Sequence, residues 1–437
     1  MTSNAVLRWN AVALDAVATD AMPGYGDQAG PTRTSRALAI VQLAVFDAVN
    51  SIDRRYTPYL MRRQFPRGSS IRAAVGEAAH DTLVRLYPKQ SAKFDAALSK
   101  ELAAITNEPA ERLGLAAGQL AASRILAARA DDGSNKTMTY QVALRPGAFY
   151  VYPGETAALT PQWGDVKTFA MKSARQVHPN PPPALNSLAY ATAYQEVKDY
   201  GGDGVTTPTK RTAEQTVIGK FWGYDGTPGL GTPPRLYNQI TRVLATQEKM
   251  DLTQDARLFA LVNMAMADSG VSCWACKYDF AYWRPIRGIR QVGPAGEDLN
   301  DGNTLTTADP TWTPLGAPCT NCAPGQTNFT PPFPAFDSGH ATFGAAMFET
   351  LKNVIGRDKV TFTITSDEYN GKNRDLDGTI RPLIPRTFRS FSQATEENGQ
   401  SRIYLGIHWS FDKVEGIKGG RAIADYVFSN YLRPLGH

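Results

Sequence analysis

The chain has 437 residues, of which 42% are hydrophobic and 20% are charged, and its formal net charge at pH 7 is +5. A mainly disordered chain is excluded, because this much apolar material can build a large core. The small positive charge fits an anionic ligand as well as it fits nucleic acid, and no apolar run reaches the roughly 20 residues of a membrane helix. We therefore expect a soluble protein with neither nucleic-acid nor membrane partners.

Helical periodicity dominates the first third of the chain. Apolar residues recur at spacings of three and four over residues 36–52, 70–87 and 108–133. The Pro-rich stretch 145–185 breaks this pattern and predicts a long irregular connection on the surface. Helical signals resume near Ala189. The first twenty residues lack a basic segment followed by an apolar one, so no signal peptide is visible.

The second half is also predicted to be helical. A helix is expected over 251–283, where Pro285 should stop it, and others over 341–355 and 412–432. No internal repeat and no Gly/Ser-rich linker divides the chain. We predict a mainly α protein with one domain over 1–437, in which 1–250 holds the amino-terminal helices and the Pro-rich loop, and 251–437 holds the ligand-binding motifs.

The four cysteines form two C-x-x-C pairs, Cys273 with Cys276 and Cys319 with Cys322. Two such pairs resemble a four-thiolate zinc site. The knuckle glycines of a zinc ribbon are missing, however, and the first pair lies in a predicted helix. Disulfides or free thiols are therefore favoured over zinc, and disulfides would indicate an oxidising compartment.

Lys277 and Arg284, in the stretch KYDFAYWRP, are seven residues apart. On a continuous helix this spacing puts both cations on one face, two turns apart. Two solvated cations on an exposed face would be the ordinary interpretation. Because Phe280, Tyr282 and Trp283 surround them, a buried face is favoured, and buried cations need an anion.

A second cluster, DSGHATF, stands where a Pro-rich loop turns into a helix. Ser338 can cap the helix that starts near Ala341, while Gly339 permits an unusual backbone angle and lets its N–H approach a ligand. Free N–H groups at a helix start attract anions. His340 would stand at the rim of such a site, although a capping serine beside a satisfied histidine is the common alternative.

The third cluster, SRIYLGIHWSFD, holds Arg402 and His408. The guanidinium of Arg402 can hold two oxygens of an oxyanion. A helix break at Gly406 would let Arg402 and His408 converge, and Asp412 is placed to accept a hydrogen bond from His408. A core histidine beside Trp409 is the simpler alternative. Together the three clusters indicate a pocket for a phosphate-like oxyanion.

These motifs resemble a known family. K-x6-R-P at 277–285, S-G-H at 338–340 and S-R-x5-H-x3-D at 401–412 are similar to the signature of vanadium-dependent haloperoxidases and the related acid phosphatases. Stretches outside the motifs, including KFWGYDGTPGLGTPPRLYNQI and RALAIVQLAVFDAVNSI, resemble the fungal vanadium chloroperoxidases. The resemblance implies a helical fold of two four-helix bundles with the site at the end of one.

The resemblance also implies a role for each matching residue. His408 would be the axial ligand of vanadium, and His340 the acid–base group that helps hydrogen peroxide replace a hydroxide. Lys277 would in addition polarise a peroxide oxygen. The groups expected to hold the vanadate oxygens are those of Lys277, Arg284, Ser338, Gly339 and Arg402.

Other matching positions lie around this set. Asp225 matches a carboxylate that pairs with the arginine equivalent to Arg402, and Asp412 would orient His408. Trp274 and Phe333 match aromatic residues beside the halide. Phe333 is typical of chloroperoxidases, whereas bromoperoxidases usually carry histidine there, so bromide and iodide oxidation is expected and chloride oxidation is conceivable.

Asp337 is the main departure from the family pattern, which has proline before Ser-Gly-His. An inward carboxylate would raise the pKa of His340 and hinder halide, whereas an outward one would only assist the helix start. The chain also lacks the long insertion that the fungal enzymes carry after their vanadium-binding histidine, and the C-x-x-C pairs do not belong to the resemblance.

The predicted function is therefore oxidation of halide by hydrogen peroxide to hypohalous acid, which halogenates small organic compounds, with vanadate as cofactor and without haem, flavin or nicotinamide. Two alternatives stay open. An acid phosphatase would use His408 as nucleophile through a phosphohistidine, and a binding protein would only sequester phosphate or vanadate. The resemblance implies a secreted or periplasmic location, and a homodimer is the assembly to test.

Overall fold

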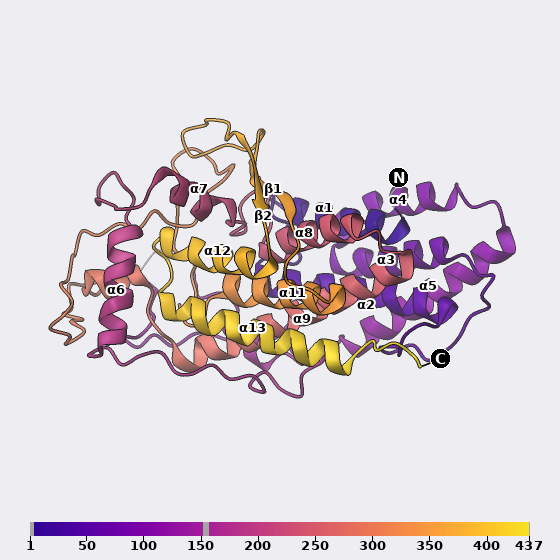
Figure 1. Ribbon diagram of the computed structural model, residues 1–437, viewed down its shortest axis with the longest axis horizontal. Helices are drawn as coiled ribbons and strands as arrows, with labels where there is room; N and C mark the ends of the chain where they lie inside the picture. Colours follow the sequence, from indigo (N-terminus) through magenta and orange to yellow (C-terminus); the bar gives the residue numbers. More distant parts are fainter. Residues whose placement is uncertain (1–3, 152–156, 437) are drawn as a thin grey trace.

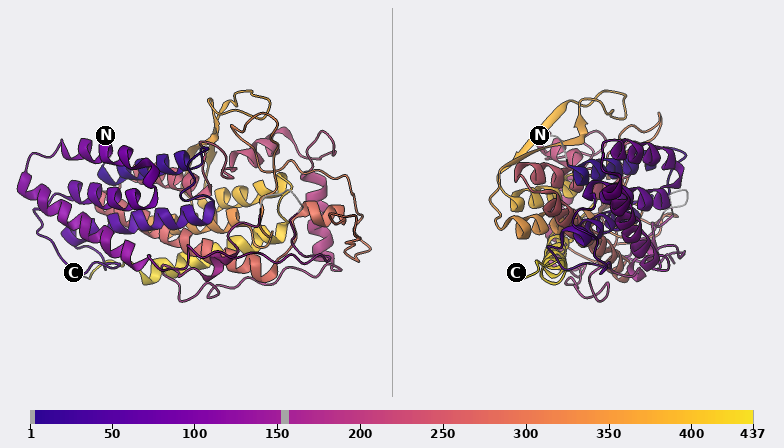
Figure 2. Two further views of the ribbon diagram at one scale, coloured as in Figure 1. Left: turned by 180° about the vertical axis from the view of Figure 1, so that it is seen from behind. Right: turned by 90° about the vertical axis from the view of Figure 1, so that its right-hand side faces the viewer.

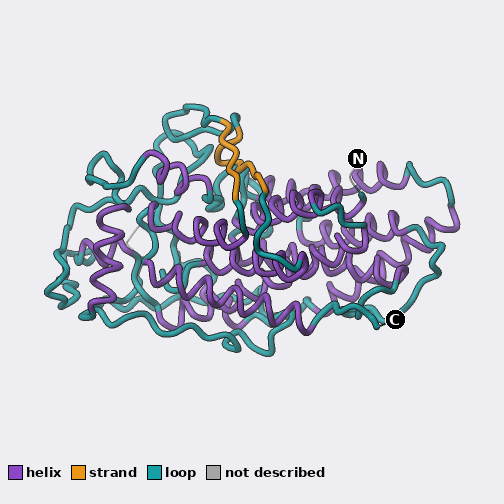
Figure 3. Tube along the Cα trace, viewed as in Figure 1, coloured by secondary structure: helices purple, strands orange, loops and turns teal. Residues whose placement is uncertain are grey.

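The computed structural model describes residues 4–151 and 157–436, and its helices run mostly along one long axis (Figure 1). The view along that axis shows the helices side by side as a bundle (Figure 2). Both termini lie toward one end, whereas the long loops and helix α6 gather at the other (Figure 3). The predicted mainly α architecture is confirmed.

The amino-terminal half of the described chain builds eight α-helices, five of them before the Pro-rich connection. Asn and Ser side chains accept hydrogen bonds from the first turns of several of these helices, which fixes where they start. The helices are α1 (Ala5–Asp20), α2 (Pro31–Asp53), α3 (Ile71–Leu86), α4 (Ser91–Leu102), α5 (Glu108–Ala128), α6 (Leu188–Tyr200), α7 (Ala213–Phe221) and α8 (Pro233–Gln247).

The carboxy-terminal half continues with helices and one hairpin. Two short 3₁₀ turns, Pro88–Gln90 and Pro161–Asp165, precede it. Its elements are α9 (Leu252–Phe280), α10 (Pro285–Arg290), α11 (Gly339–Ile355), β1 (Phe362–Asn370), β2 (Leu383–Phe388), α12 (Phe391–Tyr404) and α13 (Ser410–Asn430).

Helix α9 is the centre of the molecule. It contacts α2 on the amino-terminal side and α11 and α13 on the other, while α3 and α5 pack on α2 and on each other. Helices α2 and α9 have the length and apolar composition of membrane spans, yet 94% and 100% of their apolar windows are buried in the protein. This burial is typical of core helices. The expectation that no apolar stretch reaches the length of a membrane helix is therefore wrong, although both stretches lie in the core.

Close packing of α13 on α11 brings two of the predicted motifs together. A Cβ atom at Gly420 would lie 2.2 Å from the carbonyl oxygen of Thr342, and one at Gly416 would lie 2.9 Å from that of Ser338. The two helices can approach this closely only because both positions are glycine. The S-G-H segment at the start of α11 and the His408 segment before α13 therefore become neighbours.

The predicted helix over 251–283 ends early. Helix α9 stops at Phe280, Ala281 adopts the left-handed conformation with a φ of 46°, and Arg284 precedes the separate helix α10. The interpretation that Lys277 and Arg284 share one helical face is therefore wrong. The chain turns between them, and they reach the site from two elements.

No element was predicted for residues 356–390. In the structure they contain the antiparallel hairpin β1–β2, the only sheet among the described residues (Figure 3). Alternation of buried and exposed positions along β1 fits a strand with one face on the core. Helix α12 was also unpredicted. Its sequence is polar and has little amphipathic pattern, so periodicity gave no signal.

The described parts of the Pro-rich connection, 145–151 and 157–185, are irregular, as predicted, apart from one 3₁₀ turn. The connection is held on α9 by the buried carboxylate of Asp268, which accepts hydrogen bonds from the N–H groups of Phe169 (2.5 Å), Ala170 (2.8 Å) and Met171 (2.7 Å). Burial raises the pKa of Asp268 to about 6. The carboxylate of Asp268 thus accepts hydrogen bonds from three buried backbone N–H groups that lie outside any helix or strand.

We predict that Asp268→Ala lowers the free energy of unfolding by about 3 kcal/mol or more, because three buried N–H groups lose their acceptor. Chemical denaturation of the variant measures this. Asp279→Ala is the matched control, since Asp279 lies on the same helix in an exposed pair with Arg175 and should cost less than about 1 kcal/mol. Equal losses in the two variants would show that Asp268 does not anchor the connection.

Candidate oxyanion-binding site

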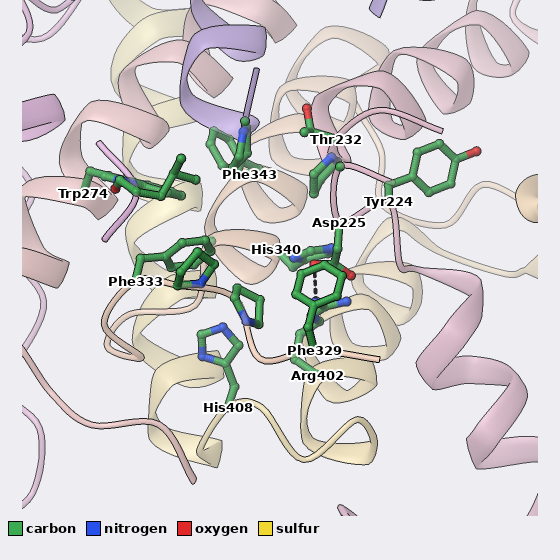
Figure 4. Close-up of a pocket in the computed structure, with 18 residues that line it drawn as sticks. Tyr224, Asp225, Thr232, Trp274, Phe329, Phe333, His340, Phe343, Arg402 and His408 are labelled. Carbon is green, nitrogen blue, oxygen red and sulfur yellow. Dashed lines mark hydrogen bonds and ion pairs between the residues drawn. The ribbon is translucent and has the colours of Figure 1, made fainter. Parts of the chain in front are cut away.

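A cavity of about 210 Å³ lies where the start of α11 meets the turn between α12 and α13. Figure 4 shows Trp274 and Phe333 on one side of it and Asp225, His340 and Arg402 on the other. The predicted residues that line this cavity are Asp225, Trp274, Phe333, Gly339, His340, Arg402 and His408. Lys277 and Ser338 do not line it, and Arg284 lines an adjoining cavity.

His408 stands just before α13, held by two partners. Its Nδ1 lies 2.8 Å from Oδ2 of Asp412, and its Nε2 lies 2.9 Å from Nη1 of Arg284. A guanidinium can only donate, so Nε2 accepts and Nδ1 carries the proton that is donated to Asp412. Burial, with Arg284 and Lys277 nearby, lowers the pKa of His408 well below its ordinary value. The imidazole is therefore neutral and keeps a lone pair on Nε2.

Asp412 does more than orient the histidine. Its Oδ2 also accepts the N–H of Trp409 at 3.0 Å, which closes the first turn of α13 around His408. Burial raises the pKa of Asp412 to about 7. The predicted contact between Asp412 and His408 is present, although His408 lies before the helix rather than in it.

The Arg284 guanidinium is completely buried beside His408. It donates to the carbonyl oxygens of Phe333 and Ile407 at 2.8 Å each, and burial lowers its pKa to about 9. Its Nη2 has no hydrogen-bond partner. A buried cation with an unused donor favours an anion at this point.

Arg402, in the last turn of α12, has the same property. Its Nη2 donates to Oδ1 of Asp225 at 2.6 Å, so the predicted pair is present (Figure 4). Its Nε and Nη1 atoms are buried and have no partner. Helix α12 ends at Tyr404, and Gly406 follows with a φ of 72°, which is the predicted break between Arg402 and His408.

Ser338 and Gly339 occupy the predicted place but differ in detail. Ser338 precedes the first residue of α11, yet its side chain makes no capping hydrogen bond, and its Oγ is buried without a partner. Gly339 is the first residue of the helix and has no positive φ. The predicted serine cap and the predicted unusual glycine conformation are therefore wrong. What remains is a free hydroxyl at a helix N-terminus.

His340 is buried, and both its ring and its backbone are fixed. Its Nε2 lies 2.7 Å from the carbonyl oxygen of Gly223, and its own carbonyl accepts from Tyr237 (3.0 Å) and Asn398 (2.8 Å). Because a carbonyl only accepts, Nε2 carries the proton and Nδ1 has the lone pair. Burial, followed by the charge of Arg402, lowers the pKa of His340 well below 6.5. A neutral base therefore faces the cavity.

Lys277 lies behind the cavity, entirely buried. Its Nζ donates to the carbonyl oxygens of Pro334 (2.9 Å), Ala335 (3.0 Å) and Asp337 (2.5 Å), and burial lowers its pKa. Three carbonyls occupy its three donors. In this arrangement Lys277 fixes the loop before Ser338, and contact with a bound oxyanion requires it to exchange one of these partners.

Trp274 and Phe333 form an aromatic wall of the cavity, with ring centroids 5.0 Å apart. The indole N–H of Trp274 donates to the carbonyl oxygen of Leu159 at 3.2 Å, so its polar edge is satisfied elsewhere. The predicted pair is thus brought together beside His340 and His408. An apolar wall next to two neutral histidines makes this side of the cavity poorly solvating for ions.

Asp337 takes neither of the two predicted orientations. Its side chain is buried, with Oδ2 3.4 Å from Oγ1 of Thr342, and Cys273 lies beside it. Burial raises the pKa of Asp337, while the charge of Lys277 opposes this. Asp337 does not contribute to the shift of His340, whose pKa falls rather than rises. The raised pKa of His340 that was expected for an inward carboxylate is therefore not found.

The cysteines do not form one site. Cys319 and Cys322 are joined by a disulfide, while Cys273 and Cys276 are free and buried in α9. A four-thiolate zinc site is excluded, because two of the thiolates are oxidised.

A single group of acidic and histidine side chains among the described residues has the spacing of a metal site, namely Glu77, His80 and Asp81. Both ring nitrogens of His80 lie near carboxylates, Asp81 at 3.0 Å and Asp95 at 2.8 Å, and these contacts raise the pKa of His80 to about 9. Carboxylates thus occupy both ring nitrogens of His80, and the group forms an ion-pair cluster in this structure.

Glu368 of β1 links the walls of the cavity, and it was not among the residues predicted from the sequence. This buried carboxylate accepts the N–H of Tyr224 at 2.9 Å, the hydroxyl of Thr320 and the guanidinium of Arg381. The segment next to Tyr224 supplies both the carbonyl that holds His340 and the carboxylate that holds Arg402. No motif marked Glu368, and only the alternating pattern of β1 could have placed it on the inner face.

Residues 257–436 match the family model described as the second helical-bundle domain of vanadium chloroperoxidase. The predicted resemblance is confirmed. The vanadium chloroperoxidase of Curvularia inaequalis is 39% identical over 269 residues, which cover 53% of this chain and 42% of that protein. The chain thus spans less than half the length of this relative.

Solved structures support the fold over nearly the whole chain. A bacterial vanadium-dependent iodoperoxidase superposes with a TM-score of 0.76 at 23% identity, covering 98% of each chain. A bacterial vanadium-dependent chloroperoxidase in its apo form gives 0.71 at 15% identity, covering 92% of this chain and 94% of its own. The helical fold is that of the vanadium haloperoxidases.

We predict that Glu368→Gln lowers the free energy of unfolding by about 3 kcal/mol, since an amide N–H₂ would face donors in a buried network. Thermal and chemical denaturation measure the loss. Glu396→Gln is the control, because Glu396 is exposed and pairs only with Lys413 at the surface. A Glu368→Gln variant as stable as this control would show that the network does not hold the cavity walls.

Proposed function

We propose that this protein is a vanadate-dependent haloperoxidase, which oxidises halide with hydrogen peroxide to hypohalous acid. The observation that carries the proposal is a set of buried donors without partners around a neutral histidine. These donors are Nη2 of Arg284, Oγ of Ser338, and Nε and Nη1 of Arg402. They belong to the residues that the family signature assigns to the vanadate oxygens.

The donor set fits a tetrahedral or trigonal oxyanion. Two guanidinium groups and a hydroxyl with partnerless donors come from three segments, and the N-terminus of α11 adds its positive dipole. Asp225 occupies only one nitrogen of Arg402, and the remaining buried donors need acceptors. His408 has the Nε2 lone pair that a vanadium ligand requires, and Nη1 of Arg284, which now donates to this atom, would have to release it for the ligand to bind. Vanadate bound there would act as a Lewis acid that activates hydrogen peroxide toward halide without changing its own oxidation state.

His340 is the group placed to move a proton. Its neutral Nδ1 can take a proton from hydrogen peroxide as it binds and can later return it to the departing oxygen. The carbonyl of Gly223 holds Nε2–H and so keeps the lone pair on Nδ1. Arg284 and Arg402 would stabilise the negative charge on the oxygens, and Lys277 could add to this after exchanging one carbonyl partner.

Trp274 and Phe333 are proposed to flank the halide. A poorly hydrated aromatic wall favours large, weakly hydrated anions, so iodide and bromide are the proposed substrates and chloride a harder one. The Cys319–Cys322 disulfide supports a secreted or periplasmic location. Hydrogen peroxide, halide and a small organic acceptor are the proposed partners, and a homodimer is the proposed assembly.

Calorimetric titration with orthovanadate tests the cofactor, and oxidation of bromide with added peroxide tests the activity. We expect vanadate to bind and to switch on bromide oxidation, Asp412→Ala to weaken vanadate binding by about 10- to 100-fold, and His408→Ala to abolish activity. His178→Ala is the control, because His178 is exposed and lies outside the cavity. Hydrolysis of an aryl phosphate that vanadate inhibits, without bromide oxidation, would indicate the phosphatase instead. Binding without either reaction would indicate sequestration.

The pH dependence follows from the lowered pKa of His340. Since burial and Arg402 hold that pKa well below 6.5, protonation of His340 should limit bromide oxidation only at pH values below 6.5. Asp337→Pro should leave this acidic limb unchanged, because Asp337 lies against Thr342 and Cys273. Rate profiles of the two proteins from pH 4 to 8 provide the test. A limb that moves to lower pH in Asp337→Pro would mean that the carboxylate acts on His340.

A further inference from the structure

His340 is hydrogen-bonded to a peptide group whose other side meets a buried carboxylate. The carbonyl oxygen of Gly223 lies 2.7 Å from Nε2 of His340, and the N–H of Tyr224 donates to Oε1 of Glu368 at 2.9 Å. This carbonyl and this N–H belong to one peptide unit. The bond between Gly223 and Tyr224 is trans, so the two groups point in opposite directions. Glu368, one peptide unit and His340 therefore form a hydrogen-bonded chain.

Glycine at position 223 lets the carboxylate come this close. A Cβ atom there would lie 2.3 Å from Oε1 of Glu368, although the backbone of Gly223 has no positive φ. The position therefore needs glycine for the close approach of Glu368 and not for an unusual backbone angle. A larger residue would push the carboxylate away from the peptide unit.

Tyr224 follows in a conformation that needs support. Its φ is 55°, in the left-handed region that a bulky residue rarely adopts. If the peptide plane turned over, this φ would become about −125°, in the ordinary extended region. Figure 4 shows the Tyr224 ring directed away from His340. The local backbone preference of Tyr224 thus favours the opposite orientation of the peptide unit.

The charge of Glu368 opposes that turn. In the turned orientation the carbonyl of Gly223 would face the carboxylate, and two oxygens that can only accept would repel each other. Glu368 cannot swing away, because its Oε2 accepts from Thr320 and Arg381. Only the observed orientation gives the carboxylate a donor and His340 an acceptor.

We propose that Glu368 is a positioning residue for the acid–base step, which keeps the proton of His340 on Nε2 by holding the peptide unit between Gly223 and Tyr224. A turned peptide would present the N–H of Tyr224 to Nε2, and the proton would then belong to Nδ1. Nδ1 could no longer take a proton from hydrogen peroxide. This catalytic consequence rests on the proposed function, whereas the tautomer itself does not.

The charge of both groups is defined at pH 8. Burial, followed by the charge of Arg402, lowers the pKa of His340 well below 6.5. Burial raises the pKa of Glu368 to about 7, which Arg381 opposes and Asp225 reinforces. At pH 8 the imidazole is therefore neutral and the carboxylate is ionised. A change of tautomer at this pH is not confused with a change of protonation.

Nitrogen NMR of the whole chain with isotope-labelled histidine, at pH 8 and before orthovanadate is added, tests the proposal. The chain has five histidines, and the signals of His340 are identified by their loss in His340→Asn. The wild type should show a protonated Nε2 and an unprotonated Nδ1. Glu368→Gln should raise the share of the Nδ1–H tautomer about tenfold or more, because an amide N–H₂ can donate to the turned carbonyl and Tyr224 gains an ordinary φ.

Glu397→Gln is the matched control. Glu397 also pairs with an arginine, Arg386, and it accepts the indole N–H of Trp222 at 3.0 Å, so it holds a side chain of the same segment rather than the peptide unit. A general loosening of this segment would affect both variants alike. Only Glu368→Gln should change the tautomer.

Two results would overturn the proposal: an Nδ1–H tautomer of His340 in the wild type, or equal tautomer ratios in Glu368→Gln and Glu397→Gln. If Glu368→Gln does not fold, Gly223→Ala breaks the same contact from the other side and should give the same shift. Bromide oxidation by the vanadate-loaded wild type reports the proposed haloperoxidase activity separately. A failure of either idea can therefore be recognised.

Discussion

Burial of positive charge is the constraint on which this structure depends. Lys277, Arg284 and Arg402 are all enclosed at the loop end of the bundle, and their desolvation would unfold a marginally stable protein unless each found acceptors. Backbone carbonyls of irregular segments supply most of them, since helix carbonyls are already used. This explains why the loop before Ser338 and the turn before α13 are not regular: their free carbonyls are needed by the cations.

The same constraint orders the rest of the site. The carbonyls and Asp225 satisfy only part of the donor capacity, and Arg284 and Arg402 each keep at least one buried nitrogen without a partner. The neutral state of His340 and His408 has the same cause. Desolvation and repulsion by the buried arginines both oppose protonation and so lower the pKa of each imidazole. Close packing of α13 on α11 through Gly416 and Gly420 then brings the two histidine-bearing segments within reach of one ligand.

Chemistry was easier to predict from this sequence than architecture. The pair of Asp412 and His408 and the break at Gly406 follow from residue type and short spacing. The pair of Asp225 and Arg402, which are 177 residues apart, was implied only by the family resemblance, and the structure has it as well. The prediction that Lys277 and Arg284 share one helical face is wrong because α9 ends at the left-handed Ala281. The sequence has no Gly or Asn at this position, which would have indicated such a turn.

The tertiary contacts could not be predicted from the sequence, because the residues that form them lie far apart in the chain. Glu368 acts through Tyr224, Thr320 and Arg381, partners that lie 144, 48 and 13 residues away and share no local pattern. Helix α12 forms although its polar sequence lacks an apolar stripe, because it packs on α11 and α7. Asp337 was ambiguous since its orientation depends on the neighbouring Cys273 and Thr342, which belong to two different helices.

A crystal structure of the protein with orthovanadate tests the central claim most directly. The account predicts an oxyanion bonded to Nε2 of His408, with its oxygens within hydrogen-bond distance of Ser338 Oγ and of the partnerless guanidinium nitrogens of Arg284 and Arg402. An anion bound elsewhere, or a cavity without an anion at saturating orthovanadate, would contradict it.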